Sequence, residues 1–368
     1  MPSTASEQTT DTFGCTNCGA DLRYAAGSSH LACDYCGTKN EIPQKDLSID
    51  ELDFEAYLDK ETAGADSLTV QAIDCTNCGA TTTMESTIAS TACPYCSTPL
   101  ITKDAHVETL IKPGSLLPFK LTKAQGLASF KRWMKKLWFK PSALTKQALS
   151  FDHFKGVYLP YFTYDADTHT FYTGQRGEYY YVTETYTTVE DGKTVTKTRQ
   201  VQKTRWYSVS GYIDRAFDDI LICASKSVPE KQIDKLEPWG LHDLIPFDEK
   251  YLSGYITEKY QLDLKMGFVK AKHVMEPYIT ELIHRDIGGD LQRIHSKQTT
   301  HRQITFKHLL LPAYVSAYKF KGKLYRFVIN ARTGEVQGER PWSYGKIALA
   351  VLGGIAVVAL IVWLTQGQ

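Results

Sequence analysis

The order of apolar and polar residues predicts a strand-rich protein downstream of residue 153. Runs rich in tyrosine, threonine and valine recur there, and these residues favour strands. Residues 179–189 and 193–207 flank Asp191-Gly192, a strong signal for a two-residue hairpin turn. We expect a long, polar, projecting hairpin rather than a phosphate-binding surface, because carboxylates face most of its cations. The predicted pairs are Glu190 with Lys193, Glu184 with Arg199, Val182 with Val201 and Glu178 with Arg205.

Helical periodicity occurs at three places in the chain. Residues 248–260 and 263–287 are predicted to form helices. Within residues 105–151, apolar side chains recur at helical spacing among cations, and Pro141 ends the pattern. This basic amphipathic helix fits either an anionic membrane surface or ordinary packing on a domain. Its apolar positions are Leu127, Phe130, Met134, Leu137 and Trp138, and its cations are Lys131, Arg132, Lys135 and Lys136.

A second β segment is predicted over residues 301–338. It contains turn signals at Lys321-Gly322 and Arg332-Thr333-Gly334. Residues 158–164 resemble residues 310–318, and each run is expected to begin a strand with its proline, an allowed position. The repeat suggests a duplicated strand unit.

The C-terminal region contains 18 consecutive residues, 347–364, without a charged or strongly polar side chain. Eleven of them are Ile, Leu or Val, and as a helix they are about 27 Å long, close to the hydrocarbon thickness of a bilayer. Aromatic residues flank the run and cations precede it, so the positive-inside rule keeps the preceding chain cytoplasmic. We predict a transmembrane helix over residues 345–364 and a single-pass protein of the cell membrane. A buried core helix is the alternative.

The net charge of +1 hides two oppositely charged parts. Residues 1–104 hold 5 Lys and Arg against 16 Asp and Glu, whereas the remaining 264 residues hold 37 against 25. A uniformly basic nucleic-acid-binding chain is therefore excluded, but a charged partner or a membrane surface is not.

Eight of the nine cysteines form four C-x-x-C pairs, and the set repeats with an offset of 60 residues. Paired thiolates at this spacing suit a tetrahedral metal site, so we predict two structural zinc ions, with iron left open by spacing alone. Glycine follows three of the pairs, whereas Ser97 follows the fourth, which is expected to be less regular. No secretory signal precedes the cysteines, so we do not expect them to form disulfides. The predicted ligands are Cys15, Cys18, Cys33 and Cys36 in one site, and Cys75, Cys78, Cys93 and Cys96 in the other.

These patterns predict an α+β protein with two small zinc-ribbon modules, a β-rich cytoplasmic domain with helical insertions and one C-terminal transmembrane helix. The ribbons occupy residues 12–40 and 72–103, and the β-rich domain residues 104–340. Residues 1–11 are expected to be disordered. Residues 41–71 form an acidic linker whose short helix begins with a Ser48/Glu51 capping box. The linker is either a spacer or an acidic docking helix.

The sequence lacks common catalytic signatures, including a phosphate-binding loop, H-E-x-x-H and G-x-S-x-G. Asp165, Asp167 and His169 cluster, but Asp-Ala-Asp between aromatic runs is predicted to be a turn. We therefore expect a non-enzymatic protein with no small-molecule substrate.

Together these blocks resemble a family, the bacterial twin zinc-ribbon proteins with a C-terminal membrane anchor. This is the YdjG-like group, often labelled TFIIB-type zinc ribbon or PriA-like. The resemblance covers nearly the whole chain, and it implies membrane association beside SPFH-domain and other envelope-stress proteins. Besides the paired ribbons, it rests on residues 117–119 with the basic helix that follows them, and on residues 156–162, 309–312 and 328–341.

The leading functional hypothesis is an interaction scaffold or adaptor at the cytoplasmic face of the membrane, with protein partners and the lipid bilayer as its contacts. Both ribbons carry more acidic than basic residues, which disfavours nucleic acid. The alternative is a membrane-tethered nucleic-acid-binding factor that uses the basic residues 112–146. A third hypothesis, an enzyme with an unrecognised site in the β-rich domain, has no motif to support it.

Overall fold

The computed structural model describes residues 13–43, 48–61, 67–83, 90–101, 105–142, 144, 154–190 and 192–366. Within these residues the protein is a strand-rich α+β structure with few helices, two clusters of four cysteines and one apolar C-terminal helix. The predicted disordered segment 1–11 lies outside the described residues, as does Asp191 of the hairpin turn.

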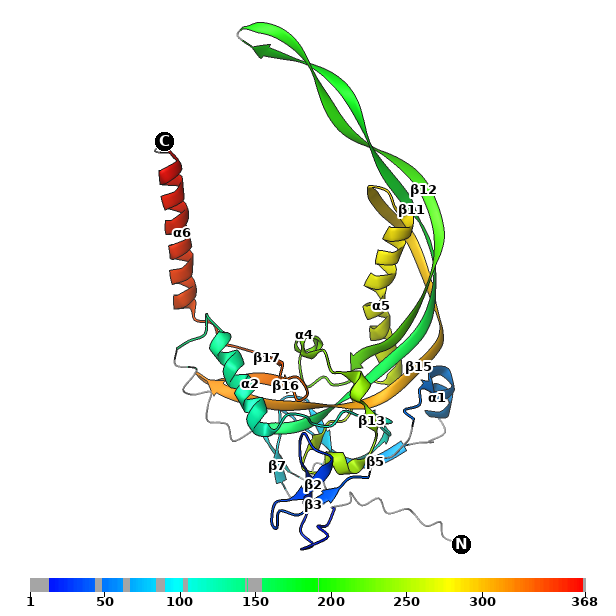
Figure 1. Cartoon of the computed structure of the whole chain (residues 1–368), viewed down its shortest axis with the longest axis vertical. Helices are drawn as coiled ribbons and strands as arrows, with labels where there is room; N and C mark the ends of the chain where they lie inside the picture. Colours follow the sequence, from blue (N-terminus) through cyan, green and yellow to red (C-terminus); the bar gives the residue numbers. More distant parts are fainter. Residues whose placement is uncertain are drawn as a thin grey trace.

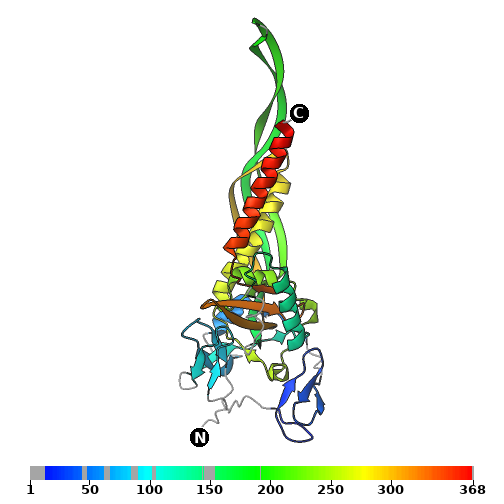
Figure 2. The same ribbon diagram turned by 90° about the vertical axis from the view of Figure 1, so that its left-hand side faces the viewer.

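The two cysteine clusters lie in small antiparallel modules near the N-terminus. The first cysteine module (residues 13–42) is a three-stranded sheet, and the second cysteine module (residues 67–111) contains a three-stranded and a two-stranded sheet. Both modules lie at the end of the molecule opposite its long projections (Figures 1 and 2). The strands of the first are β1 Leu22–Tyr24, β2 His30–Cys33 and β3 Lys39–Glu41; those of the second are β5 Ser67–Asp74, β6 Thr81–Thr83, β7 Ser90–Ala92, β8 Pro99–Ile101 and β9 His106–Ile111.

The chain between the second module and the C-terminal helix, which we call the body (residues 112–340), is built on a nine-stranded sheet. Its three long strands are β11 Lys155–Glu190, β12 Lys193–Cys223 and β15 Leu291–Phe320, and β11 lies between the other two. The shorter strands are β4 Leu52–Asp53 from the linker, β10 Ser115–Leu116, β13 Ile245–Pro246, β14 Ile256–Thr257, β16 Lys323–Asn330 and β17 Val336–Gly338.

Two proline-containing runs pair with each other at the centre of this sheet. Tyr158 lies opposite Pro312, and Pro160 lies opposite Leu310. The expectation that each proline begins a strand is wrong, because both lie inside long strands. Each proline carbonyl accepts a hydrogen bond from the residue that directly follows a neighbouring strand. The donor to Pro160 is the N–H of Ala224, after β12, at 2.9 Å, and the donor to Pro312 is the N–H of Ala331, after β16, at 3.0 Å. Proline has no N–H to donate, but the neighbouring strand ends at this position, so no hydrogen bond between strands is lost.

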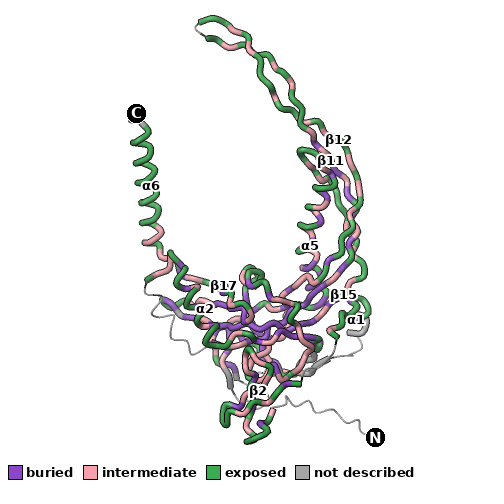
Figure 3. Tube along the Cα trace, viewed as in Figure 1, coloured by how far each residue is buried: buried purple, intermediate pink, exposed green. Residues whose placement is uncertain are grey.

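The predicted register of the long hairpin is confirmed. Glu184 lies opposite Arg199, with Glu190 opposite Lys193 and Glu178 opposite Arg205. The strands extend far beyond the predicted limits, since β11 has 36 residues and β12 has 31. Beyond the end of β15 they continue as a two-stranded ribbon, the arm (residues 178–205), which projects from the body and is mostly exposed (Figures 1 and 3).

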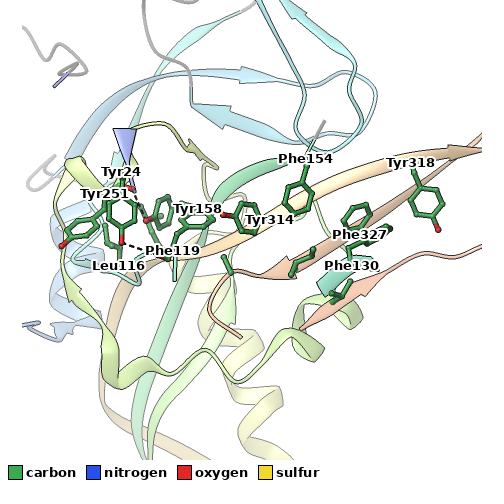
Figure 4. Close-up of a cluster of buried hydrophobic side chains, with 14 of the residues drawn as sticks. Tyr24, Leu116, Phe119, Phe130, Phe154, Tyr158, Tyr251, Tyr314, Tyr318 and Phe327 are labelled. Atoms are coloured by element: carbon green, nitrogen blue, oxygen red, sulfur yellow. Dashed lines mark hydrogen bonds between the residues drawn. The ribbon is translucent and has the colours of Figure 1, made fainter. Parts of the chain in front are cut away.

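Two longer helices cover the sheet. In α2, Lys123–Lys136, a Thr122–Gln125 capping box begins the helix, and Phe130 stacks on Phe327 at 4.0 Å between ring centroids (Figure 4). Its apolar side thus packs on the body, whereas Trp138 just beyond it is 83% exposed. The second, α5 Leu264–Ile287, begins at the N-cap Asp263, as predicted.

The other two helical predictions need correction. Residues 248–260 are not a helix: they contain the short 3₁₀ turn Glu249–Leu252 and the strand β14. In the linker, α1 Phe54–Glu61 begins after Asp53, whose carboxylate accepts from the Ala56 N–H at 2.7 Å. Ser48 instead donates to Asp50, so the Ser48/Glu51 capping box is wrong. The remaining short elements are α4 Glu230–Ile233 and the 3₁₀ turns Asp234–Leu236 and Leu241–Asp243.

The chain ends in α6, Tyr344–Gln366. Residues Tyr344–Thr365 are long and apolar enough to cross a membrane, and none of this stretch is buried. Its first turn is held to the loop after α2, where Ser343 N–H donates to Phe139 at 2.8 Å and Lys346 Nζ donates to Lys140 at 2.9 Å. Residues 348–365 are all exposed.

Candidate metal centres

The structure brings the eight predicted ligands together as two clusters of four. In each cluster the sulfur atoms all lie within 4.8 Å of one another. The closest pairs are Cys15–Cys36 at 3.6 Å and Cys18–Cys33 at 3.5 Å, then Cys75–Cys96 at 3.4 Å and Cys78–Cys93 at 3.5 Å. These separations are too long for a disulfide of about 2.05 Å. They approach the edge of about 3.8 Å expected for a tetrahedron with metal–sulfur bonds of about 2.3 Å.

All four cysteine knuckles have the same backbone form. Gly19, Gly37 and Gly79 have φ of 74°, and Ser97 has φ of 61°. Ser97 N–H donates to the Cys93 carbonyl at 2.9 Å, the same distance as from Gly37 to Cys33. The expectation that the fourth knuckle is less regular is therefore wrong: serine adopts the left-handed conformation here, at some cost in strain.

The thiols of each cluster have unequal proton affinities. The hydroxyl of Thr38 and then its backbone N–H lower the pKa of Cys36 to about 5. In the second cluster the Cys93 thiol donates to Cys78 and lowers the pKa of Cys78 to about 5, while the pKa of Cys93 itself is raised. Cys36 and Cys78 therefore favour the thiolate form, and a bound cation would replace the protons of the other thiols as countercharge.

The two modules pack on opposite faces of the body sheet. Tyr158 belongs to the buried cluster that contains the core of the first cysteine module, and its neighbours Val157 and Leu159 belong to the cluster that contains the core of the second. Since successive strand residues point to opposite faces, β11 lies between the modules. Its apolar run is uninterrupted because both faces are covered.

Polar contacts fix the first module to the body. Tyr24 N–H donates to the Ser253 carbonyl at 3.0 Å, and Ser253 Oγ donates to the Leu22 carbonyl at 2.6 Å. The Tyr24 ring meets Tyr251 edge-on at 4.9 Å, beside Phe119 and Tyr158 (Figure 4). The edge of β1 is therefore the docking edge of this module.

The second module is fixed through a buried carboxyl group, Glu258. Tyr95, two residues after Cys93, donates its hydroxyl hydrogen bond to Glu258, and both side chains are 2% exposed. Ser225 and Ser227 also donate to this carboxyl. Burial raises the pKa of Glu258 to about 7. No local sequence signal pairs position 95 with position 258, so sequence reasoning missed this contact.

Comparison with curated proteins finds an uncharacterized protein, YdjG of Bacillus subtilis (strain 168). It is 26% identical over 372 residues, covering 96% of this chain and 98% of that protein. No family model matches the chain, and no solved structure matches it. The likeness to YdjG thus extends over nearly the whole length of both proteins.

A third group of possible ligands lies outside the cysteine clusters, where Glu51, Asp165 and Asp218 come together. Asp165 lies in β11 beside a bulge, so the predicted Asp-Ala-Asp turn is wrong. Burial raises the pKa of Asp165 to about 6. Lys307, whose side chain is 12% exposed, pairs with Glu51 at 3.1 Å and with Asp219 at 2.8 Å. A protein cation thus already pairs with Glu51 of this group and with Asp219 beside it, and we interpret the group as structural.

The Tyr95–Glu258 contact gives a stability prediction. Replacing Tyr95 with phenylalanine removes one hydrogen bond to a buried carboxyl, so we expect the free energy of unfolding to fall by about 1–3 kcal/mol. Urea denaturation of both proteins with their metal sites saturated measures this change in the free energy of unfolding. Tyr35→Phe in the first module is the matched control and should change nothing, because Tyr35 is 86% exposed. Equal effects of the two substitutions would contradict the proposed role of the contact.

Proposed function

We propose that the protein is a non-enzymatic adaptor, anchored by α6 in the cell membrane, with its cysteine modules and body on the cytoplasmic side. The two modules are zinc ribbons that stabilise the body and bind protein partners. The observation that carries the proposal is the exposure of α6: beyond its first turn, residues 348–365 of this long apolar helix are all exposed in the described part of the chain. A bilayer supplies the missing apolar surroundings.

Zinc is the metal best suited to the cysteine clusters. Four thiolates per site, without histidine, carboxylate or an open position, are the ligand set of structural zinc. Reduced thiols also agree with a cytoplasmic location, where disulfides are rare. Bound zinc would order modules that are too small to bury enough apolar surface by themselves.

Protein partners are favoured over nucleic acid by charge. The first module, residues 13–42, carries two basic and three acidic side chains, and a tetrathiolate zinc centre adds negative charge. Binding to phosphates requires an excess of Lys and Arg, which this end of the molecule lacks. The resemblance to the YdjG-like group makes SPFH-domain membrane proteins the partner class to test first.

Insertion of α6 into a membrane requires that it point away from the arm. The arm and α6 project from the same side of the body (Figures 1 and 2), and the arm carries charged pairs such as Glu184 with Lys203 at 3.1 Å. Such a ribbon cannot enter hydrocarbon, because its charges and open strand edges would lose water. In the described part of the chain, the hydrogen bonds between the body and this end of the chain lie at Ser343 and Lys346, at the start of α6. We therefore propose that α6 turns away from the arm about residues 341–343 when it inserts.

The outer face of α2 provides a prediction about the membrane surface. Lys131, Arg132, Lys135 and Lys136 are exposed, and the loop after α2 holds the start of α6. Each cation near an anionic surface contributes about 1 kcal/mol, so replacing all four with glutamate should weaken binding of residues 1–342 to phosphatidylserine vesicles at least tenfold, by rough estimate. Vesicle sedimentation measures this, with neutral phosphatidylcholine vesicles as the control. Unchanged binding would contradict a lipid-facing α2, and steeply salt-dependent DNA binding would favour the nucleic-acid alternative.

The adaptor proposal is tested by purifying the full-length protein from membranes, with and without metal chelation. A partner protein that is retained only while the modules hold metal supports it. Recovery of the protein alone under both conditions contradicts it.

A further inference from the structure

The two cysteine modules are internal copies, so each residue of one has a counterpart 60 positions along the chain. The second knuckle reads Cys33-Asp-Tyr-Cys36 in the first module and Cys93-Pro-Tyr-Cys96 in the second. Tyr35 and Tyr95 therefore occupy the same place beside their cysteine clusters. The environments of these two tyrosines are nevertheless opposite.

In the second module the tyrosine knuckle is a docking element. Cys93, Pro94, Tyr95 and Cys96 are all buried. The Tyr95 ring joins the apolar cluster that includes Val228 and Trp239, and its hydroxyl donates to the buried Glu258. The body thus shows what surroundings accept such a knuckle: apolar side chains around a buried carboxyl group.

In the first module the same knuckle is free. Asp34, Tyr35, Cys36 and Gly37 are all exposed, and Tyr35, at 86%, is the most exposed large apolar side chain among the described residues. This module docks through the edge of β1 and Tyr24, which turns its knuckle outward. A tyrosine beside a metal cluster is left with its ring in water, and no hydrogen bond of its hydroxyl is seen in the described part of the chain.

We propose that the exposed knuckle, residues 34–37, is a docking site for a protein partner that offers an apolar pocket with a recessed aspartate or glutamate. Tyr35 fills the pocket and donates its hydroxyl hydrogen bond to that carboxylate, as Tyr95 does to Glu258. The site deepens the adaptor function proposed above and rests on it. A second copy of this chain cannot supply the pocket, because its own Tyr95 already occupies it.

The charged groups next to Tyr35 are paired with each other. Asp34 replaces Pro94, and it forms a salt bridge with Arg23 at 3.5 Å, both side chains being about 70% exposed. The counterpart of Arg23 in the second module is Thr83, which is uncharged. Arg23 therefore pairs with the carboxylate of Asp34, the anion adjacent in sequence to Tyr35 that the second module lacks, so that Asp34 is not an unpaired anion facing an incoming carboxylate.

The test places a photo-crosslinking amino acid, p-benzoylphenylalanine, at position 35 of the full-length protein in its native membrane. Tyr181, 64% exposed on the arm, is the matched control position. We expect a discrete cross-linked protein from position 35 and not from position 181, mapped by mass spectrometry to a segment with an aspartate or glutamate. Tyr35→Phe and Arg23→Ala should each weaken binding of the purified partner by roughly tenfold or more, and Tyr181→Phe should not.

The proposal is overturned if cross-linking at position 35 does not exceed the control, or maps to a segment without a carboxylate or to a second copy of the chain. It is also overturned if replacing the mapped carboxylate with its amide leaves the affinity unchanged. A partner that co-purifies equally with wild type and Tyr35→Phe would leave the adaptor function standing and refute this site. Absence of any membrane partner would refute both.

Discussion

Replacing Cys93 with serine is expected to unfold the body as well as the second cysteine module. Cys93 is 1% exposed and belongs to the same buried cluster as Val157, Leu159 and Trp239. Loss of one thiolate removes much of a metal-binding free energy of about 10–16 kcal/mol, comparable with the whole stability of a typical domain. The module would then release its side of the sheet and expose the apolar face of β11.

Metal analysis and the fluorescence of buried Trp239 measure this effect. The variant should retain one metal ion per chain, and its tryptophan emission should shift to the red at temperatures where the wild type is folded. Cys18→Ser is the matched control: it also removes one ligand, but in the first module, on the opposite face of the sheet from Trp239. Full stability and two bound ions in Cys93→Ser would show that the second cluster is not structural.

Ending the chain at Trp342 is expected to move the protein from the membrane fraction to the soluble fraction without unfolding it. Since residues 348–365 of α6 are exposed, its removal uncovers little of the body beyond the loop at Phe139 and Lys140 that holds its start. The shortened protein should keep its two metal ions and its unfolding midpoint. Carbonate extraction and sedimentation of cell fractions make the comparison, with the full-length protein expected to resist extraction.

A second variant distinguishes loss of the anchor from loss of the fold. Val358→Arg places a charge near the centre of α6, which costs about 2.5–3.5 kcal/mol of insertion free energy and should weaken anchoring while keeping the chain length. If the shortened protein still sedimented with membranes as an integral protein, α6 would not be the anchor.

Features with short, fixed spacing could be predicted from the sequence. The C-x-x-C pairs define both clusters, because ligands with only two residues between them need little help from the fold. The register of Glu184 with Arg199 follows from one turn, since strand pairing leaves no freedom once the turn is set. Asp263 likewise marks the start of α5 through its own side-chain hydrogen bond.

Features that depend on distant parts of the chain could not be predicted. Residues 248–260 look helical by periodicity, but they become irregular where the two modules dock on Ser253 and Glu258. The prolines of β11 and β15 are tolerated in strand interiors only because β12 and β16 end beside them. The difference in exposure between Tyr35 and Tyr95 also depends on tertiary contacts. Their local sequences are nearly the same, and only the docking of each module on the body differs.

Cross-linking mass spectrometry of the full-length protein in native membranes tests the central claim most directly. The account predicts cross-links from the first cysteine module to a membrane partner, lost on metal chelation and absent in the protein that ends at Trp342. Cross-links confined to this chain in both samples, with or without metal, would contradict the proposal that the protein is a membrane-anchored adaptor.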